Sequence, residues 1–254
     1  MRVAELRHLV LVLGDQLDLD AAAFDGFDPA RDAVWMAEVA EESTHVWSSK
    51  PRTVMFLAAM RHFAQALRAA GRPLHYKRLD DQSNRGSLRA QLEADIGRLR
   101  PARLVLTAPG DWRVLQAIEA AAQACGLPLD IREDRHFYCS LREFAAHARG
   151  RKSLRMEYFY REMRQRHAVL MQGDAPEGGQ WNFDPDNRGA FAAAGPGAVP
   201  PRAVFPPDAL TREVIALVAE RFATHPGRLD DFAWPVTRAQ ALGDFAQQLV
   251  PGRM

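Results

Sequence analysis

A small group of polar residues that could bind a ligand stands near the amino terminus. Residues 9–13 form a short, unbroken apolar run, and Gly14, Asp15 and Gln16 come directly after it. A carboxylate beside an amide suits hydroxyl groups and the donor–acceptor edge of a heterocycle better than it suits pyrophosphate. The competing interpretation is a strand-ending turn, in which the Asp15 side chain bonds to its own backbone.

A second polar group belongs to the next apolar run, residues 33–39. The carboxylates of Glu38, Glu41 and Glu42 stand at the end of this run and just beyond it. Paired carboxylates can perform acid–base chemistry, but acidic residues also crowd the starts of helices. No second catalytic group stands nearby in the sequence. We therefore favour ligand contact by one of the three glutamates over catalysis, and we assign no catalytic residue.

Several common chemistries lack their motif in this sequence. There is no GxGxxG after the first apolar run and no GxxxxGK[ST], so common dinucleotide and phosphate loops lose support. There is no GxSxG elbow for a nucleophilic serine. The eight histidines show no metal-binding spacing, and the two cysteines, Cys125 and Cys139, are too few for a four-sulfur site. We assign no metal ligand, and we expect reduced thiols.

The stretch 150–166 mixes basic and aromatic residues. Such mixtures can bind nucleic acid through phosphate contacts and base stacking. They also occur in amphipathic helices that turn their aromatic rings inward and their charges outward. Because Glu157 and Glu162 dilute the charge, we favour the amphipathic helix. The stretch contains Arg151, Lys152, Arg155, Arg161, Arg164 and Arg166, interleaved with Tyr158, Phe159 and Tyr160.

The elements that position these residues alternate between strands and helices. This alternation predicts an α/β fold with a five-stranded parallel, Rossmann-like sheet in the order 3-2-1-4-5 and helices on both faces. Ligands bind such sheets beyond the carboxyl ends of the strands. The predicted strands are 9–13, 33–39, 74–79, 103–106 and 127–131, and the predicted helices are 51–70, a segment from Ser87 and a segment from Asp111 to about 124.

The rest of the chain has a different character. A long helix is predicted over 153–170, an irregular segment rich in Gly and Pro over 172–208, and short helices near 210–223 and 236–249. Lys and Arg number 33 against 32 for Asp and Glu, so no global basic field indicates nucleic acid. No apolar stretch is long enough for a membrane helix. We expect a soluble, cytoplasmic protein with no membrane partner.

Whole phrases of the sequence resemble one family. Together they resemble the deoxyribodipyrimidine photolyase-related proteins, the iron–sulfur bacterial cryptochromes and photolyases. The resemblance runs over essentially the whole chain, and the phrase around Trp181 on a linker is its most specific part. The phrases are 11–17 (LVLGDQL), 59–63 (AMRHF), 150–154 (GRKSL), 156–161 (MEYFYR) and 178–184 (GGQWNFD), followed by Asn187-Arg188.

The resemblance implies a light-dependent flavoprotein. In that family an amino-terminal α/β domain holds a 6,7-dimethyl-8-ribityllumazine antenna, and a helical domain holds FAD and a 4Fe-4S cluster. Light then drives repair of a (6-4) photoproduct in DNA, or signalling. By this resemblance, residues 1–150 are the antenna-binding domain, 151–209 the long helix and interdomain linker, and 210–254 the start of a truncated helical FAD-binding region.

The sequence ends about where the helical domain of the family begins. We therefore expect the chain alone neither to bind FAD nor to repair DNA, and we expect DNA binding only together with that domain. The segment 172–208 should be poorly anchored without it. Two other interpretations stay open: a stand-alone α/β nucleotide- or flavin-binding module, and a cofactor-free interaction domain. The oligomeric state is also open.

Position and resemblance together predict an antenna site at the mouth of the first two strands. Arg188 is the residue that the resemblance places against flavin in a full-length protein, where a planar donor fork would suit a flavin edge or phosphate. The residues predicted to contact the antenna are Gly14, Asp15, Gln16, Met36, Ala37, Glu38 and Glu42, with Leu13 beside the ring.

Overall fold

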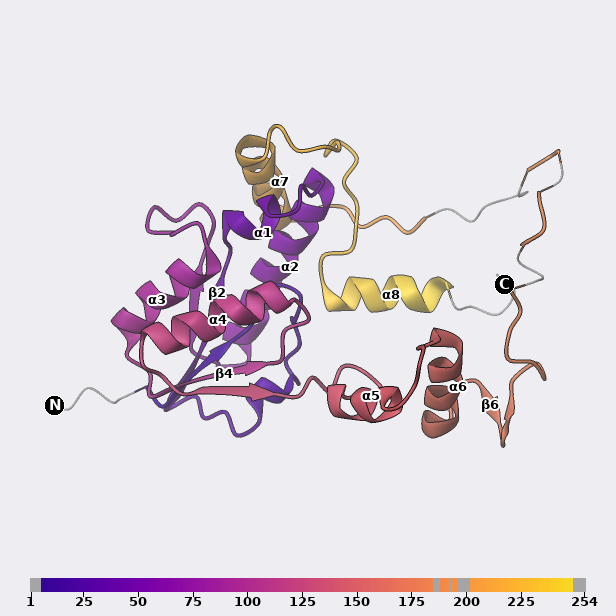
Figure 1. Ribbon diagram of the computed structural model, residues 1–254. Coiled ribbons are helices and arrows are strands. Elements are labelled where there is room, and N and C mark those ends of the chain that lie inside the picture. Colours follow the sequence, from indigo (N-terminus) through magenta and orange to yellow (C-terminus); the bar gives the residue numbers. More distant parts are fainter. Residues whose placement is uncertain (1–5, 185–187, 192, 196–201, 249–254) are drawn as a thin grey trace. The chain divides into compact units, whose positions relative to one another are not determined.

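The computed structural model describes residues 6–184, 188–191, 193–195 and 202–248 (Figure 1). Contacts divide the chain into two compact units, of which the first holds the residues up to Arg132 and those from Ala203 onward. The second unit holds Glu133–Arg202. This division groups the residues differently from the three segments predicted above, because residues 209–221 pack against the helix over residues 50–69. The functional labels of those segments stay predictions.

The first unit contains a five-stranded, all-parallel sheet in the order β3-β2-β1-β4-β5, which confirms the predicted fold class and strand order. β1 lies at its centre, and Leu9 in β1 is 0% exposed. The strands are β1 (His8–Leu11), β2 (Asp32–Ala37), β3 (Leu74–Lys77), β4 (Arg103–Thr107) and β5 (Leu129–Arg132).

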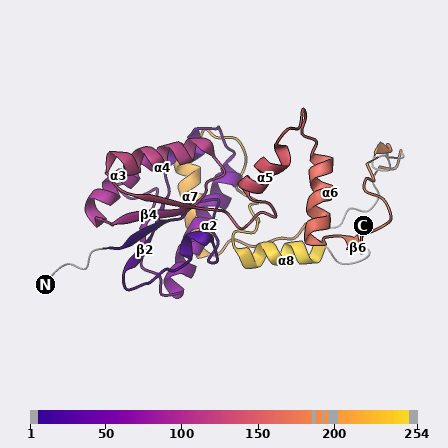
Figure 2. The same cartoon turned by 60° about the horizontal axis from the view of Figure 1, so that its bottom comes forward.

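Helices cover both faces of this sheet (Figures 1 and 2). Alternate side chains of β2 point to opposite faces, as the pleat of a strand requires. Val34 and Met36 join one core with α2 and α7, whereas Trp35 and Ala37 join the other with α3 and α4. The elements are η1 (Ala22–Phe24), α1 (Ala40–Thr44), α2 (Lys50–Ala69), α3 (Leu88–Leu99), α4 (Trp112–Ala124), α7 (Ala209–Arg221) and α8 (Arg238–Gln248).

Side-chain caps start α2, α3 and α4 just after a loop. The hydroxyl of Ser49 accepts a hydrogen bond from a backbone N–H in the first turn of α2, and Ser87 does the same for α3. The Asp111 carboxylate accepts from the N–H of Arg113 at 2.8 Å and caps α4, where a helix was predicted to begin. Caps of this kind satisfy amide groups that a helix start leaves without partners.

The second unit contains α5 (Leu141–Ala148), α6 (Met156–His167) and a small hairpin of β6 (Met171–Gln172) and β7 (Ala175–Pro176). The predicted long helix over 153–170 is therefore too long. α6 ends because Ala168 takes a left-handed conformation with φ of 53°. Apart from the hairpin, the described residues of the predicted irregular segment 172–208 form no extended strand or long helix, and most are exposed.

The aromatic rings of α6 do not all turn inward, so the favoured amphipathic arrangement is only partly correct. Phe159 packs against Phe144 of α5, with ring centroids 5.2 Å apart. Tyr158 and Tyr160 remain 50% and 46% exposed. The second unit therefore presents aromatic surface that its own core does not use.

The chain rejoins the first unit after residue 202, so buried residues of α7 should contribute to the stability of that unit. Val218 of α7 is 0% exposed and belongs to the core with α2, whereas Val204 is 66% exposed. Val218→Ala should lower the free energy of unfolding by about 2 kcal/mol, from two lost methyl groups and the cavity that they leave. Val204→Ala is the matched control and should change it little. Urea unfolding measures both, and equal stability of the two variants would contradict the packing.

Candidate functional site

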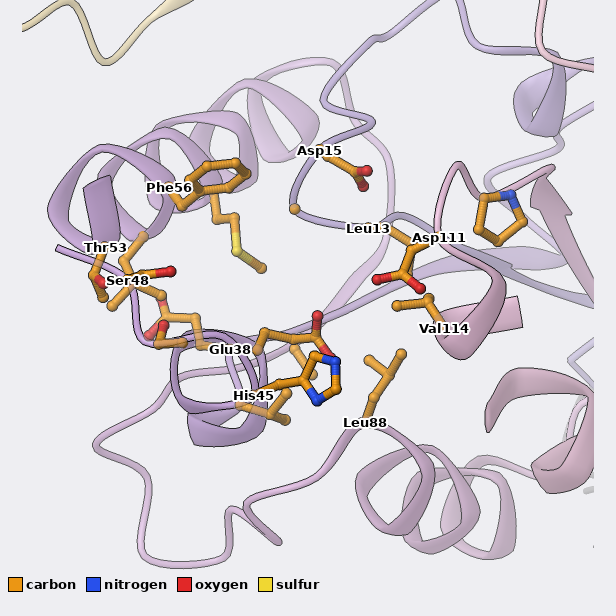
Figure 3. A pocket seen from close by; sticks show the side chains of 18 of the residues that line it. Leu13, Asp15, Glu38, His45, Ser48, Thr53, Phe56, Leu88, Asp111 and Val114 are labelled. Carbon is orange, nitrogen blue, oxygen red and sulfur yellow. The ribbon is translucent and has the colours of Figure 1, made fainter. Parts of the chain in front are cut away.

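A cavity of about 320 Å³ opens at the carboxyl ends of β1, β2 and β4 (Figure 3). β1 stands between β2 and β4 in the sheet. The connection after β1 therefore leads toward one edge of the sheet, and the connection after β4 leads toward the other edge. Such switch points are where open α/β sheets bind ligands. The cavity is therefore where the topology predicted a site.

One wall of the cavity is apolar. Leu13 follows β1, Phe56 and Met60 come from α2, and Val114 comes from α4. Gly14 brings the backbone close to α2, since a Cβ atom there would lie 3.0 Å from the Met60 sulfur. A side chain at this position would therefore press on Met60, which also lines the cavity.

Polar groups stand around the apolar wall on the three segments that follow β1, β2 and β4. Asp15 follows β1, Glu42 belongs to α1 after β2, and Asp111 precedes α4. Figure 3 shows Asp15, Asp111 and His45 around the cavity, with Phe56 on the opposite side from Asp111. Convergent polar groups beside an apolar wall are typical of small-molecule sites.

Arg113 is a polar residue of this site that the sequence analysis missed. Its guanidinium donates to both carboxylate oxygens of Glu42, at 2.9 Å and 2.8 Å. These hydrogen bonds are the main reason that the pKa of Arg113 lies above its ordinary value. Its Nε atom is buried and has no hydrogen-bond partner among the described residues. The only signal in the sequence was its place two residues after the Asp111 cap.

Glu38 lines the cavity but has its carboxylate fully engaged elsewhere. Arg61 of α2 donates to both oxygens at 2.8 Å and 2.9 Å, and the Leu79 N–H donates at 2.8 Å. The Tyr76 hydroxyl donates at 2.5 Å, and burial raises the pKa of that phenol far above its usual range. Glu38 is 1% exposed, so its first role is to hold the loop after β2 in place.

The remaining predicted residues divide into two groups. Gly14, Asp15, Ala37 and Glu42 join Glu38 on the cavity wall. Gln16 and Met36 do not line it. The Gln16 amide donates to the Ala108 carbonyl at 2.9 Å, and Met36 is buried in the core beneath α2, since its place in the pleat turns it away from Ala37.

Comparison with known proteins places the chain in a family. A family model described as deoxyribodipyrimidine photo-lyase-related protein matches residues 10–234. The chain belongs to this family. A (6-4) photolyase of Agrobacterium fabrum (strain C58 / ATCC 33970) is 44% identical over 237 residues. The match covers 93% of this chain and 46% of that relative, so the chain spans about half of the relative's length.

The other predicted cofactor residue of the photolyase-related chain belongs to the second unit. Arg188 belongs to the second unit and is exposed, and its predicted flavin contact stays a prediction. The described part of the chain contains no group of three or more His, Cys, Asp or Glu side chains that could hold a metal ion. Within the same residues, no helix is long and apolar enough to cross a membrane.

The Glu38–Arg61 pair predicts a sharp loss of stability. Removing one partner of a buried ion pair costs about 3–5 kcal/mol, because the other charge stays buried without compensation. Arg61→Met should therefore destabilise the photolyase-related chain by that amount, measured by urea unfolding. Arg68→Met, on the exposed side of the same helix, is the matched control and should change little.

A double variant separates lost charge from lost packing. In Arg61→Met/Glu38→Gln the buried group is neutral, so part of the lost stability should return. If the double variant is no more stable than Arg61→Met, the cost comes from packing and not from the uncompensated carboxylate.

Proposed function

We propose that this chain is the antenna-binding portion of a photolyase-related flavoprotein and holds 6,7-dimethyl-8-ribityllumazine in the cavity at the sheet edge. The observation that carries the proposal is a preformed cavity at the switch point of the sheet, in a chain that belongs to this family. The name of the 44% identical relative supports a light-dependent role in DNA repair. Blue-light signalling is the other role that the family resemblance offers.

The residues around the cavity fit this ligand. A ribityllumazine combines a flat, polar ring system with a chain of hydroxyl groups, so its site needs an apolar slot with a few polar groups. Leu13, Phe56 and Met60 supply the slot. The volume of about 320 Å³ lies within the range of about 300–1,000 Å³ that is usual for small-molecule sites.

Three side chains would provide the polar contacts. The carboxylates of Asp15 and Glu42 can accept hydrogen bonds from ring N–H and ribityl O–H groups. Arg113 can only donate, so it would face the carbonyl oxygens of the ring. Its buried Nε atom lacks a partner among the described residues, and an acceptor on the ligand would satisfy it. Ala37 and Gly14 would let the ring approach the backbone.

Repair itself is proposed only for a longer protein. FAD and a 4Fe-4S cluster belong to full-length relatives in this proposal, and the two cysteines of this chain cannot supply four cluster ligands. Arg188 would contact the flavin there. The DNA lesion is proposed as the substrate of that longer protein, and a cytoplasmic location is proposed with it.

Lumazine binding tests the proposal directly. A hydrogen bond to a charged carboxylate contributes about 1.5–3 kcal/mol, so Glu42→Ala and Asp15→Ala should each weaken binding about tenfold or more. Glu220→Ala removes an exposed glutamate from α7 and should bind like wild type. Titration followed by lumazine fluorescence measures all four proteins.

Three results would contradict the antenna site. Equal affinity of wild type, Glu42→Ala and Asp15→Ala would place the ligand elsewhere. Tight binding of FMN but not of lumazine would favour the nucleotide- or flavin-binding module, and binding of neither would favour the cofactor-free interaction domain.

A double-mutant cycle tests the role of Arg113. Because Arg113 and Glu42 hold each other through two hydrogen bonds, their effects on the ligand should be coupled. Arg113→Gln should weaken lumazine binding about tenfold, and the double variant Arg113→Gln/Glu42→Ala should lose less than the sum of the two single changes. A coupling free energy of at least about 0.5 kcal/mol is expected, and strict additivity would show two independent contacts.

A further inference from the structure

One part of the cavity wall is an exposed segment that has little support of its own. We call residues 45–48, which lie between α1 and α2, the rim segment. His45 and Ser48 line the cavity, as does Val46 (Figure 3). Val46 and Trp47 are nevertheless 65% and 68% exposed, and the preceding α1 has no buried side chain. The rim segment therefore needs contacts from elsewhere in the fold if it is to keep its shape.

The support comes from a turn that lies much later in the chain. We call residues 222–227, which directly follow α7, the α7 turn. His225 in this turn is 8% exposed, and its Nδ1 atom lies 2.8 Å from the Ser48 carbonyl oxygen. A carbonyl oxygen only accepts hydrogen bonds, so Nδ1 carries the hydrogen. The imidazole of His225 thereby holds the backbone of the rim segment.

Further contacts join the α7 turn to the start of α2, just after the rim segment. The Lys50 N–H donates to the Pro226 carbonyl at 2.7 Å, and the Lys50 ammonium donates to the Ala223 carbonyl at 3.5 Å. Gly227 has φ of +96°, and a Cβ atom there would lie 2.7 Å from the Pro51 Cδ atom. The two segments therefore approach so closely that this position requires glycine.

The ring of His225 also contacts two aromatic side chains. Its centroid lies 5.1 Å from that of Phe222 and 6.2 Å from that of Trp47. Phe222 is 4% exposed and belongs to the core with α2, whereas Trp47 belongs to the rim segment. His225 thus stands between the core and the rim segment, and it contacts the rim segment through both a hydrogen bond and its ring.

We infer that His225 is a positioning residue of the ligand cavity, which holds the rim segment in place through the hydrogen bond to Ser48. His45, Val46 and Ser48 then keep their positions on the cavity wall before a ligand arrives. A wall without this contact would have to be ordered when the ligand binds, and that ordering would weaken binding.

His225 gives the segment after residue 202 a part in ligand binding. The predicted antenna domain, residues 1–150, contains neither His225 nor the rest of the α7 turn, so its rim segment would be loose. The identity of the ligand rests on the proposed function, whereas the contact between His225 and Ser48 does not depend on it. The protein without ligand and the binding of lumazine are therefore measured separately.

Hydrogen–deuterium exchange of the ligand-free 254-residue chain tests the contact itself. His225→Phe keeps an aromatic ring but removes the donor, so the α7 turn loses its hold on the rim segment. The Lys50 amide, which donates to Pro226, should then exchange about tenfold faster, the effect expected from one lost hydrogen bond. His225→Asn should restore slow exchange, because its amide nitrogen stands as many bonds from the backbone as Nδ1 does.

Stopped-flow fluorescence of bound lumazine tests the effect on the cavity. His225→Phe should release lumazine about tenfold faster than wild type, since changes at a binding site act mainly on the dissociation rate. Release from His225→Asn should stay close to that of wild type. Gly227→Ala is a second variant of the same contact. Its methyl group would push the α7 turn away from Pro51, so release should be faster there also.

His62→Phe is the matched control. His62 lies about three turns beyond the start of α2 and does not line the cavity. Its Nε2 atom lies 3.4 Å from the Thr211 hydroxyl of α7, so the change removes a histidine contact between the same two helices. Lys50 exchange and lumazine release should both stay within about twofold of wild type, since distant sites act independently. Urea unfolding of each variant shows whether a loss of global stability accompanies the change.

Four results would overturn the positioning role. They are unchanged Lys50 exchange in His225→Phe, faster exchange with unchanged lumazine release, equal effects in His62→Phe, and failure of His225→Asn to restore either measurement. Wild type that binds no lumazine would contradict the antenna proposal alone, because the exchange experiment still shows whether His225 holds the rim segment.

Discussion

The edge of the sheet at which the cavity opens depends on one buried carboxylate. Glu38 lies directly after β2, and a charge in that position is stable only when donors surround it. Arg61 brings α2 to it, Tyr76 brings β3, and the Leu79 N–H brings the following loop. Four donors on three elements therefore converge on one side chain. The edge has a defined shape before any ligand arrives.

Backbone contacts extend this anchoring around the same edge. The Asn84 amide donates to the Glu38 carbonyl at 2.6 Å, and the Glu41 N–H donates to the Gly86 carbonyl at 3.1 Å. On the other side of β1, the Gln16 amide fastens the first loop to the loop after β4. Gln16 thus shapes the site although it does not line the cavity. A rigid rim lowers the entropy that a bound ligand would otherwise have to remove.

The sequence was enough to predict the sheet and the edge at which the cavity opens. Short apolar runs separated by amphipathic segments allow few topologies, and parallel strands bring their carboxyl ends together wherever those ends lie in the chain. That is why Asp15 and Glu42 reach one cavity. Alternation along β2 could also have shown that Met36 and Ala37 face opposite sides of the sheet, so assigning both to one slot was an avoidable error.

The partners of charged side chains could not be predicted in the same way. Arg113 stands 71 residues after Glu42, and Arg61 stands 23 residues after Glu38. Local patterns of hydrophobicity do not determine which distant arginine reaches which carboxylate, because that depends on side-chain packing in three dimensions. The prediction that the tyrosines of α6 turn inward failed for a related reason. Helical spacing indicates a common face, but only the tertiary structure decides whether that face is covered.

The two units differ in how far their charged side chains are compensated by partners, and this difference bears on function. In the first unit, buried acids such as Glu38, Asp32 and Asp95 each accept several hydrogen bonds. Their negative charge is therefore compensated inside the fold. In the second unit, the carboxylates near residues 149–155 are paired with other groups, so the exposed arginines and lysine of this range carry excess positive charge toward solvent. A net charge of +1 conceals this difference, because it sums over both units. The distribution of charge, and not its total, is what indicates the kind of ligand that each unit can bind.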